Sequence, residues 1–182
     1  MSRKKPEHYV DNKKFYESIL EHRENCKIAK EKGKEEPRLP EYIGECIWKI
    51  AKHLSYHPWF INYSFKDEMI GDGIENCFQY FHRFNPDKYK NPFAYFTQIT
   101  YFAFRRRIMK EEKNRYIIYK NFETNIVLGG HGDLLVDSEN NLLSPLIYDN
   151  IKEFLEKYEA KEKIKKINRK KAKELSDAKE KH

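Results

Sequence analysis

The chain has 182 residues and a formal net charge of +7 at pH 7; 39% of its residues are hydrophobic and 15% are aromatic. This length suits one domain with polar extensions, and a mean hydropathy of −0.95 predicts a small core built largely of rings. No apolar stretch approaches the roughly 18 residues of a membrane span, and no apolar run follows the basic start "MSRKK", so we expect a soluble intracellular protein. The positive charge favours a polyanionic partner.

The first two helices are predicted from apolar residues that recur at steps of three and four. Asp11 is a plausible cap for the first, and Gly33 a stop. Its inward positions are Phe15, Ile19, His22, Cys26 and Ala29. After the polar linker "KGKEEPRLPEY", the second helix ends before Pro58. Its inward positions are Ile43, Ile47, Ile50 and Leu54.

The third helix is predicted to begin at Ser64, with Asp67 three residues on as a carboxylate variant of the capping box. Its apolar positions are Ile70, Ile74, Cys77, Phe81 and Phe84. These stripes allow the helices to pack as a small bundle. The cysteines Cys26, Cys46 and Cys77 lack C-x-x-C spacing and are predicted to be reduced core residues.

The fourth helix, from Pro92 to about Lys113, has rings on more than one side. Asn91 is its expected cap, and Pro92 suits the first helical position. One side, which we expect to face the core, holds Phe93, Phe96, Thr100, Ala103 and Phe104. Another side holds Tyr95, Gln98, Ile99, Phe102 and Met109, with Tyr101 between the two. No charged residue precedes Arg105, so the helix is either buried all round or covered on its second side by a ligand.

The last third of the chain is predicted to be helical around one long loop. "RYIIYKNFETNIV" is a further helix, either continuous with the fourth or separate. The loop "LGGHGDLLVDSENNLLS" follows, and a last helix begins at Ser144 and Pro145. Its apolar positions end by Ile167, and a solvated basic tail is expected beyond. Strand signals are almost absent, so the fold class is all-α.

Three groups of residues contain side chains that occur in catalytic or metal sites. His53 and His57 have the H-x-x-x-H spacing of a metal pair on one helix face, but no third ligand is evident. "GGHGD" at 129–133 lacks the Lys-Ser/Thr of a phosphate loop. Acidic residues early in the third helix are accounted for by the helix dipole. We therefore expect no enzyme, no metal and no cofactor.

The aromatic helix is followed at once by cations, which are Arg105, Arg106, Arg107, Lys110, Lys113 and Arg115. Rings that stack on unpaired bases beside cations that hold phosphates are the components of single-strand recognition. A stand-alone single-stranded DNA- or RNA-binding protein is one function that fits this pattern. An all-round buried helix with an exposed basic end is the structural alternative.

The order of these features resembles conserved region 2 of bacterial sigma factors: an acidic-capped helix, the turn "FNPDKYKNP", then an aromatic helix ending in arginines. At residue level, 66–115 resembles the late-transcription sigma factors of T-even-type bacteriophages. "EMIGDGIE" and "YKNPFAY" are the specific signals. Weaker similarity extends back to about Asp11 and forward to "LIYDNI".

This resemblance implies a sigma factor that directs host core RNA polymerase to viral late promoters through a minus-ten-like element, in the cytoplasm of the infected bacterial host. It implies an N-terminal helix and linker at 1–36, a sigma region 2-like domain at 37–128, and a loop, helix and basic tail at 129–182. The third helix would dock on the beta-prime clamp helices. The polymerase-binding residues would be Asp67, Glu68, Asp72, Glu75 and Phe78. The promoter-binding residues would be Tyr95, Gln98, Tyr101, Phe102, Arg105, Arg106 and Lys110.

The sequence departs from the family pattern in three places. Gln98 and Ile99 stand where the larger family has a tryptophan pair that holds the melted edge, which suggests an easily opened promoter or help from a viral co-activator. About 50 residues follow Gly130, too few for a second domain that reads an upstream element. The terminus "SDAKEKH" lacks the hydrophobic-acidic epitope with which T-even-type late sigma factors bind the sliding clamp, so that partner is a candidate only.

Overall fold

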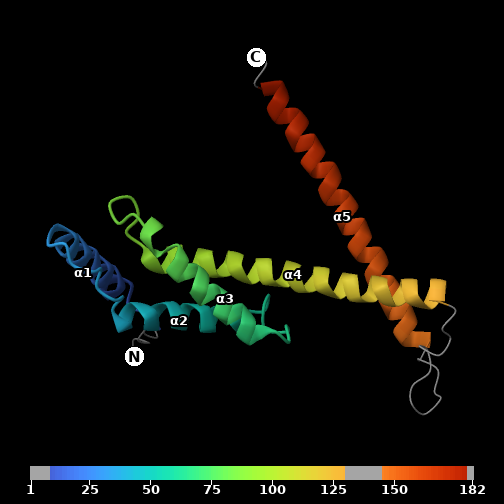
Figure 1. The fold of residues 1–182 in the computed structure, drawn as a ribbon, viewed down its shortest axis with the longest axis horizontal. Coiled ribbons are helices and arrows are strands. Elements are labelled where there is room, and N and C mark those ends of the chain that lie inside the picture. Colours follow the sequence, from blue (N-terminus) through green and yellow to red (C-terminus); the bar gives the residue numbers. More distant parts are fainter. Residues whose placement is uncertain (1–8, 130–144, 180–182) are drawn as a thin grey trace, which may run out of the picture. The chain divides into compact units, whose positions relative to one another are not determined.

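The computed structural model describes residues 9–129 and 145–179, and over them it contains helices and no strand (Figure 1). The elements are α1 (Asn12–Glu31), α2 (Glu41–Ser55), α3 (Lys66–Gln79), the 3-10 helix η1 (Phe81–Arg83), α4 (Pro92–Gly129) and α5 (Pro145–Lys179). The predicted all-α class is confirmed. Ser144 and the predicted loop after Gly129, with most of "GGHGD", lie outside the described residues.

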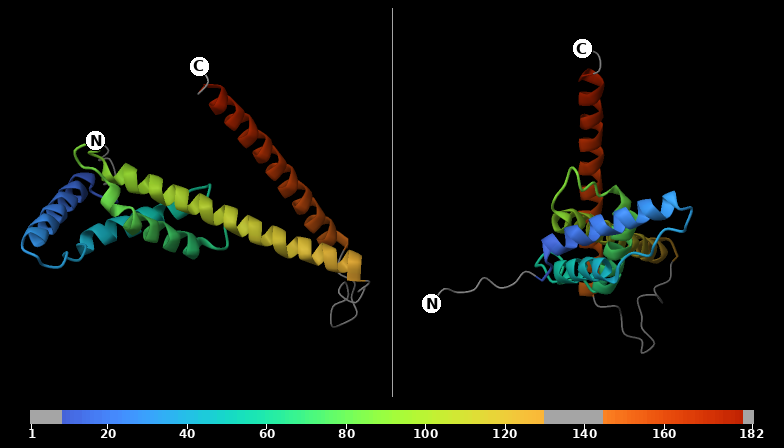
Figure 2. Two further views of the ribbon diagram at one scale, coloured as in Figure 1. Left: turned by 45° about the horizontal axis from the view of Figure 1, so that its top comes forward. Right: turned by 90° about the vertical axis from the view of Figure 1, so that its left-hand side faces the viewer.

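The chain divides into two compact units, Met1–Met109 and Lys110–His182. In the first unit α1 and α3 each pack against α2, and the first part of α4 covers α3 (Figure 1, Figure 2). The second unit holds the rest of α4 and α5. The boundary therefore lies inside α4. Because α4 is one continuous helix, the segment after Lys113 belongs to the fourth helix and is not separate.

The sequence signals at Asp11, Asn91 and Gly33 mark helix ends in the structure. The Asp11 carboxylate accepts hydrogen bonds from the Lys13 and Lys14 backbone N–H groups at 2.9 and 3.1 Å. The Asn91 side chain accepts one from the Ala94 N–H at 3.0 Å. Gly33 closes the turn after α1 with φ of 62°, a left-handed conformation that glycine adopts without strain.

The capping box predicted at Ser64 is wrong. The capping residue of α3 is Phe65, whose carbonyl accepts the first helical hydrogen bond from the Met69 N–H at 3.1 Å, and no side chain caps the end. The Phe65 ring packs on Tyr63, with ring centroids 5.2 Å apart. Ring packing within the preceding turn thus delays the helix by one residue.

The predicted third helix is also too long at its other end. α3 stops at Gln79, and Phe81 and Phe84 reach the core from η1 and the residue after it. The guanidinium of Arg23 donates hydrogen bonds to the carbonyls of His82, at 3.1 Å, and Phe84. An arginine from α1 therefore satisfies carbonyls that the broken helix leaves free.

The core of the first unit is rich in rings, as predicted. Its fully buried members include Phe15, Ile19, Ile43, Ile47, Ile50, Cys77, Phe84 and Phe96. On α3, however, Met69 and Gly73 are buried while Ile70 and Ile74 are half-buried. The reason is a close approach of α4: a Cβ atom at position 73 would lie 2.9 Å from Thr100 Cγ2 and 3.0 Å from Phe104 Cε1. The missing side chain of glycine lets the two helices meet here.

The cysteines agree only in part with the core prediction. Cys46 and Cys77 are buried and unbridged, whereas Cys26 is half-buried. Burial raises the pKa of the Cys77 thiol to about 11, and its sulfur lies 3.3 Å from the Thr100 hydroxyl oxygen. Such a thiol remains protonated near neutral pH and is inert.

In the second unit, the end of α4 packs on α5 through stacked rings. The Tyr116 and Tyr158 ring centroids are 4.5 Å apart, and the Tyr116 hydroxyl donates a hydrogen bond to Glu159 at 3.1 Å. Lys161 binds Glu112 at 2.8 Å. Beyond this contact α5 stays helical to Lys179, so the expected basic tail is a helix, and its described side chains beyond Lys165 are exposed.

Candidate nucleic-acid and partner interfaces

The side of α4 predicted to bind DNA is exposed over much of its length. Gln98, Arg105 and Lys110 are exposed, and Phe102 retains 45% of its accessible surface. Tyr101 is half-buried, with the Arg105 guanidinium 5.9 Å from its ring centroid. The predicted core side is buried at Phe96, Thr100, Ala103 and Phe104 and half-buried at Phe93. The helix is therefore not buried all round.

Tyr95 differs from the other predicted DNA-binding residues because its ring belongs largely to the core. It lies 5.1 Å from the Phe84 ring centroid, and its hydroxyl donates a hydrogen bond to the Tyr80 carbonyl at 3.2 Å. Burial raises the pKa of the Tyr95 hydroxyl. The side chain thus fastens the turn before α4, and only its remaining surface is open to a ligand.

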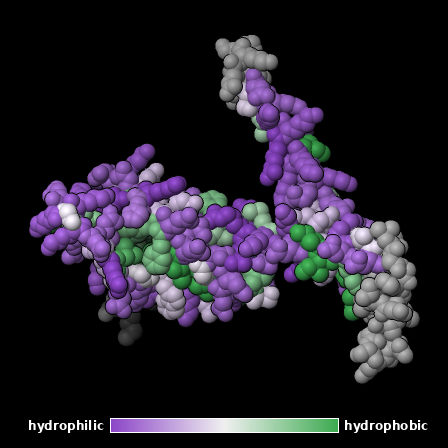
Figure 3. Space-filling view, in the orientation of Figure 1, coloured by the Kyte–Doolittle hydropathy of each residue, from purple (hydrophilic) through white to green (hydrophobic). Residues whose placement is uncertain are grey.

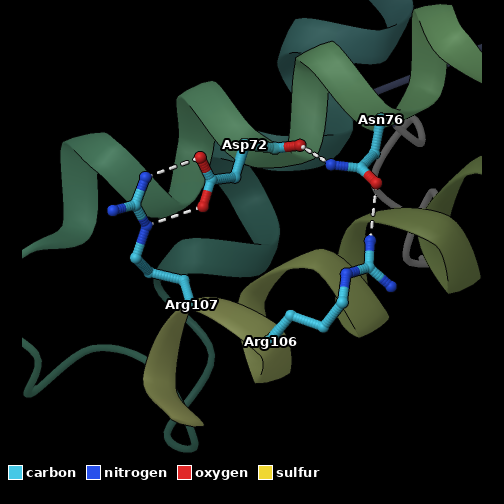
Figure 4. Close-up of polar contacts among 4 residues, drawn as sticks. All are labelled: Asp72, Asn76, Arg106 and Arg107. Atoms are coloured by element: carbon cyan, nitrogen blue, oxygen red, sulfur yellow. Dashed lines mark hydrogen bonds and ion pairs between the residues drawn. The ribbon is translucent and has the colours of Figure 1, made fainter. Parts of the chain in front are cut away.

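Two arginines of α4 are bound to α3 (Figure 4). Arg107 makes a bidentate pair with the Asp72 carboxylate, with nitrogen–oxygen distances of 2.6 and 2.7 Å. Arg106 donates to the Asn76 side-chain oxygen at 2.6 Å, and the Asn76 amide donates to the Asp72 carbonyl at 2.7 Å. Asp72 and Arg106, predicted for polymerase and DNA respectively, therefore also join the two helices. The structural role of Arg107 could not be predicted, because nothing local in the sequence pairs it with residue 72.

The other predicted polymerase-binding residues lie on an open face of α3. Asp67, Glu68 and Glu75 are exposed, and Phe78 retains 42% of its surface. Phe78 borders a groove of about 470 Å³ between α2 and α3. The groove is lined by Leu39, Pro40, Glu41, Gly44, Glu45, Trp48, Ile74 and Phe78. Sequence reasoning missed Trp48, because a single ring on the outer side of α2 has no pattern that marks a site.

Hydrophobic residues also reach the surface elsewhere in the first unit. On the face in view, Figure 3 shows them gathered where α2, α3 and the start of α4 meet, within a largely hydrophilic surface. The connection from α2 to α3 adds Trp59, which is 67% exposed and lies 6.2 Å from the Tyr101 ring. The ring-rich "SYHPWF" was the signal in the sequence, but only the fold brings it beside α4.

The histidine pair does not form the predicted helical motif. α2 ends at Ser55, so His57 lies in the following turn, while the His53 ring stacks on Tyr9 at 3.8 Å. Pro58 ends the helix early because the residue before a proline is disfavoured in helical conformation. Within 9–129 and 145–179, no cluster of three or more potential metal ligands was found.

One segment of α5, in the second unit, is strongly basic. Residues 161–173 contain eight Lys or Arg and one Glu, which gives +7, and the other 28 basic and 28 acidic residues cancel. Lys161 and Lys165 pair with glutamates. The remaining lysines of this segment and Arg169 have no ion-pair partner within 4.0 Å in the described part of the chain.

The chain was also compared with known proteins. No protein-family model and no curated protein matches it. Among the described helices, none has both the length and the apolar character needed to cross a bilayer. The resemblance to sigma factors therefore depends on the sequence motifs.

Proposed function

We propose that this chain is a sigma-type promoter-specificity subunit that binds host core RNA polymerase and directs it to viral late promoters. The observation that carries the proposal is the pairing of α3 with α4 through Gly73 and the Asp72–Arg107 contact. Each helix leaves an open face: an acidic one with an apolar groove on α3, and an aromatic one with cations on α4. One small unit thus offers two chemically different surfaces. The proposed function assigns no catalytic activity to the chain itself.

The groove beside α3 is the proposed polymerase site. Exposed ion pairs contribute little each, so Asp67, Glu68 and Glu75 would steer and orient the partner. Affinity would come from burying Trp48 and Phe78, because large rings in a desolvated groove are the usual hot spots of protein interfaces. The beta-prime clamp helices are the partner that the sequence resemblance suggests.

The open face of α4 is the proposed promoter site. Phe102 and Tyr101 offer rings to unpaired bases, and each stacked base contributes on the order of 1 to 3 kcal/mol. Arg105 and Lys110 extend from the same helix into solvent and are available to phosphates. Their contacts would add a binding term that weakens as salt rises.

The decisive experiment combines the full chain with core polymerase on a late-type promoter. We expect polymerase to bind the chain and to initiate at the promoter, most efficiently on supercoiled or pre-opened templates. Failure both to bind polymerase and to support initiation would contradict the proposal. Binding to single strands that ignores both polymerase and sequence would instead favour a stand-alone single-strand-binding protein.

Paired variants separate the two surfaces. Replacing Arg105 and Lys110 by Ala should weaken promoter binding and lower its salt slope by roughly 1.5 to 2, while polymerase binding is retained. Replacing Trp48 and Phe78 by Ala should weaken polymerase binding and leave promoter binding and its salt slope unchanged. Arg106 and Asp72 are poor choices because each also holds α3 to α4. If both pairs impair the same activity at an unchanged melting temperature, the assignment of the surfaces is wrong.

A further inference from the structure

The connection between α2 and α3 is an ordered turn anchored in the core. The His57 carbonyl accepts hydrogen bonds from the Phe60 and Ile61 N–H groups at 2.7 and 3.0 Å. The Phe60 ring is 3% exposed and meets the Phe104 ring edge to face, with centroids 5.1 Å apart. The buried ring therefore fixes the backbone of its neighbour, Trp59.

Trp59 is held outward by this turn. Its 67% exposure is the largest among the exposed large hydrophobic side chains of the described residues. Its ring lies 4.8 Å from that of His57 and 6.2 Å from that of Tyr101, and Tyr101 contacts Phe102 at 5.7 Å. Trp59, Tyr101 and Phe102, here named the aromatic platform, are three neighbouring rings from two segments far apart in the sequence. Tryptophan is usually largely buried, so a fixed and exposed indole beside two further rings indicates a binding surface.

The charges around the aromatic platform favour an anionic ligand. The segments 46–66 and 88–110, which supply its rings, contain no Asp or Glu. The Arg105 guanidinium lies over the Tyr101 ring, 5.9 Å from its centroid. A ligand that satisfies both features must have flat faces for the rings and a negative charge for the guanidinium.

We propose that the aromatic platform stacks unpaired bases of a single nucleic-acid strand, with Trp59 as the principal stacking residue and Arg105 as a phosphate contact. Every base has an aromatic face and every nucleotide a phosphate, so this ligand meets both requirements at once. The proposal rests on the proposed function only for the source of the strand, which would be opened promoter DNA.

The test uses the two tryptophans of the full-length chain as separate reporters. Trp48→Phe leaves Trp59 alone, and Trp59→Phe leaves Trp48 alone. Each variant is titrated with a thymidine oligonucleotide of about 12 nucleotides, within the usual site size for single strands. We expect binding to quench the fluorescence of Trp59 and to leave that of Trp48 unchanged.

Affinity measurements complete the test. Trp59→Ala should weaken binding of the oligonucleotide roughly 5- to 150-fold, the usual range for loss of one stacking ring. Trp48→Ala, which removes an equally large exposed ring from α2, is the matched control and should change it less than about 2-fold. Thermal melting followed by circular dichroism checks that both variants are folded. We expect both to fold because neither tryptophan ring is buried.

Several outcomes would overturn the proposal. These are an unchanged Trp59 signal at saturation with oligonucleotide, equal affinities for Trp59→Ala and Trp48→Ala, or an equal Trp59 response to a blunt duplex. A Trp59 response to core polymerase without DNA, together with none to the oligonucleotide, would mark a protein contact instead. If polymerase binding fails but Trp59 responds to single strands, the proposed function falls and the aromatic platform stands. If polymerase binding and initiation succeed while Trp59 is silent, only the aromatic platform falls.

Discussion

We expect one buried histidine to contribute to the pH dependence of the stability of the first unit. His22 lies on the inner side of α1 with 6% exposure, 5.9 Å from the Phe81 ring and 3.6 Å from the Cys26 sulfur. Burial, and then the nearby charge of His82, hold the pKa of His22 below its ordinary value of 6.5, although Glu36 acts in the opposite direction. Between the folded and unfolded pKa values, His22 is protonated in the unfolded chain and neutral in the folded chain.

The sign of the effect follows from this difference. The contribution of His22 to stability is complete above its unfolded pKa of about 6.5, and it is lost as the pH falls through that value toward the lower folded pKa. We expect the free energy of unfolding to decrease from about pH 7.5 to pH 5.5, and the decrease to be smaller in His22→Gln. Denaturant titrations at both pH values measure this. An identical pH dependence for the parental protein and His22→Gln would refute the assignment.

At the scale of helices, the contact of α3 with α4 depends on the absence of a side chain at Gly73. An added Cβ would lie 2.9 Å from Thr100 Cγ2, which is buried and cannot move aside freely. Overpacking costs about 1 to 3 kcal/mol, while the better helix propensity of alanine returns up to about 1 kcal/mol. Gly73→Ala should therefore be destabilising, by up to about 2 kcal/mol.

Gly71 provides the control within the same helix. Nothing lies within 4 Å of a Cβ atom built there, so Gly71→Ala should stabilise the protein by up to about 1 kcal/mol. Equilibrium unfolding of both variants gives the comparison. Stabilisation by both substitutions would mean that α4 does not approach α3 as closely as described.

At the scale of the whole molecule, the distribution of charge matters more than its total. Residues 161–173 have a net charge of +7, which equals that of the whole chain. Replacing Lys166, Lys170 and Lys173 by Gln lowers the net charge to +4, by subtracting 3 from +7. If the chain binds DNA as proposed, the salt slope should fall by about 0.9 for each of these lysines that holds a phosphate.

The matched control removes the same charge elsewhere. Replacing Lys13, Lys27 and Lys32 of the α1 region by Gln also subtracts 3 from +7. Those lysines are exposed but lie among nearby glutamates, such as Glu17 and Glu24, which pair with Lys13 and Lys27. We expect this variant to keep most of the parental salt slope, measured by fluorescence anisotropy across a salt series. Equal decreases in both variants would show that total charge alone matters.

The features that could be predicted are those that depend on neighbours along the chain. The caps at Asp11 and Asn91, the glycine stop at Gly33 and the two-sided character of α4 follow from residues within a few positions of one another. Helical spacing also identified Phe15, Ile47 and Phe96 as core residues. Ser64 failed as a cap because ring packing in the turn competes with a weak local signal.

The sequence by itself determined the helical class, most helix starts, the ring-rich core and the presence of aromatic and basic residues on α4. Tertiary structure alone decided that Arg107 is committed to Asp72, that Gly73 is a contact point, and that Trp59 stands beside Tyr101. The physical reason is range. Helix propensity and capping act over one turn of chain, whereas ion pairs, close helix contacts and shared ring surfaces join residues that meet only after folding.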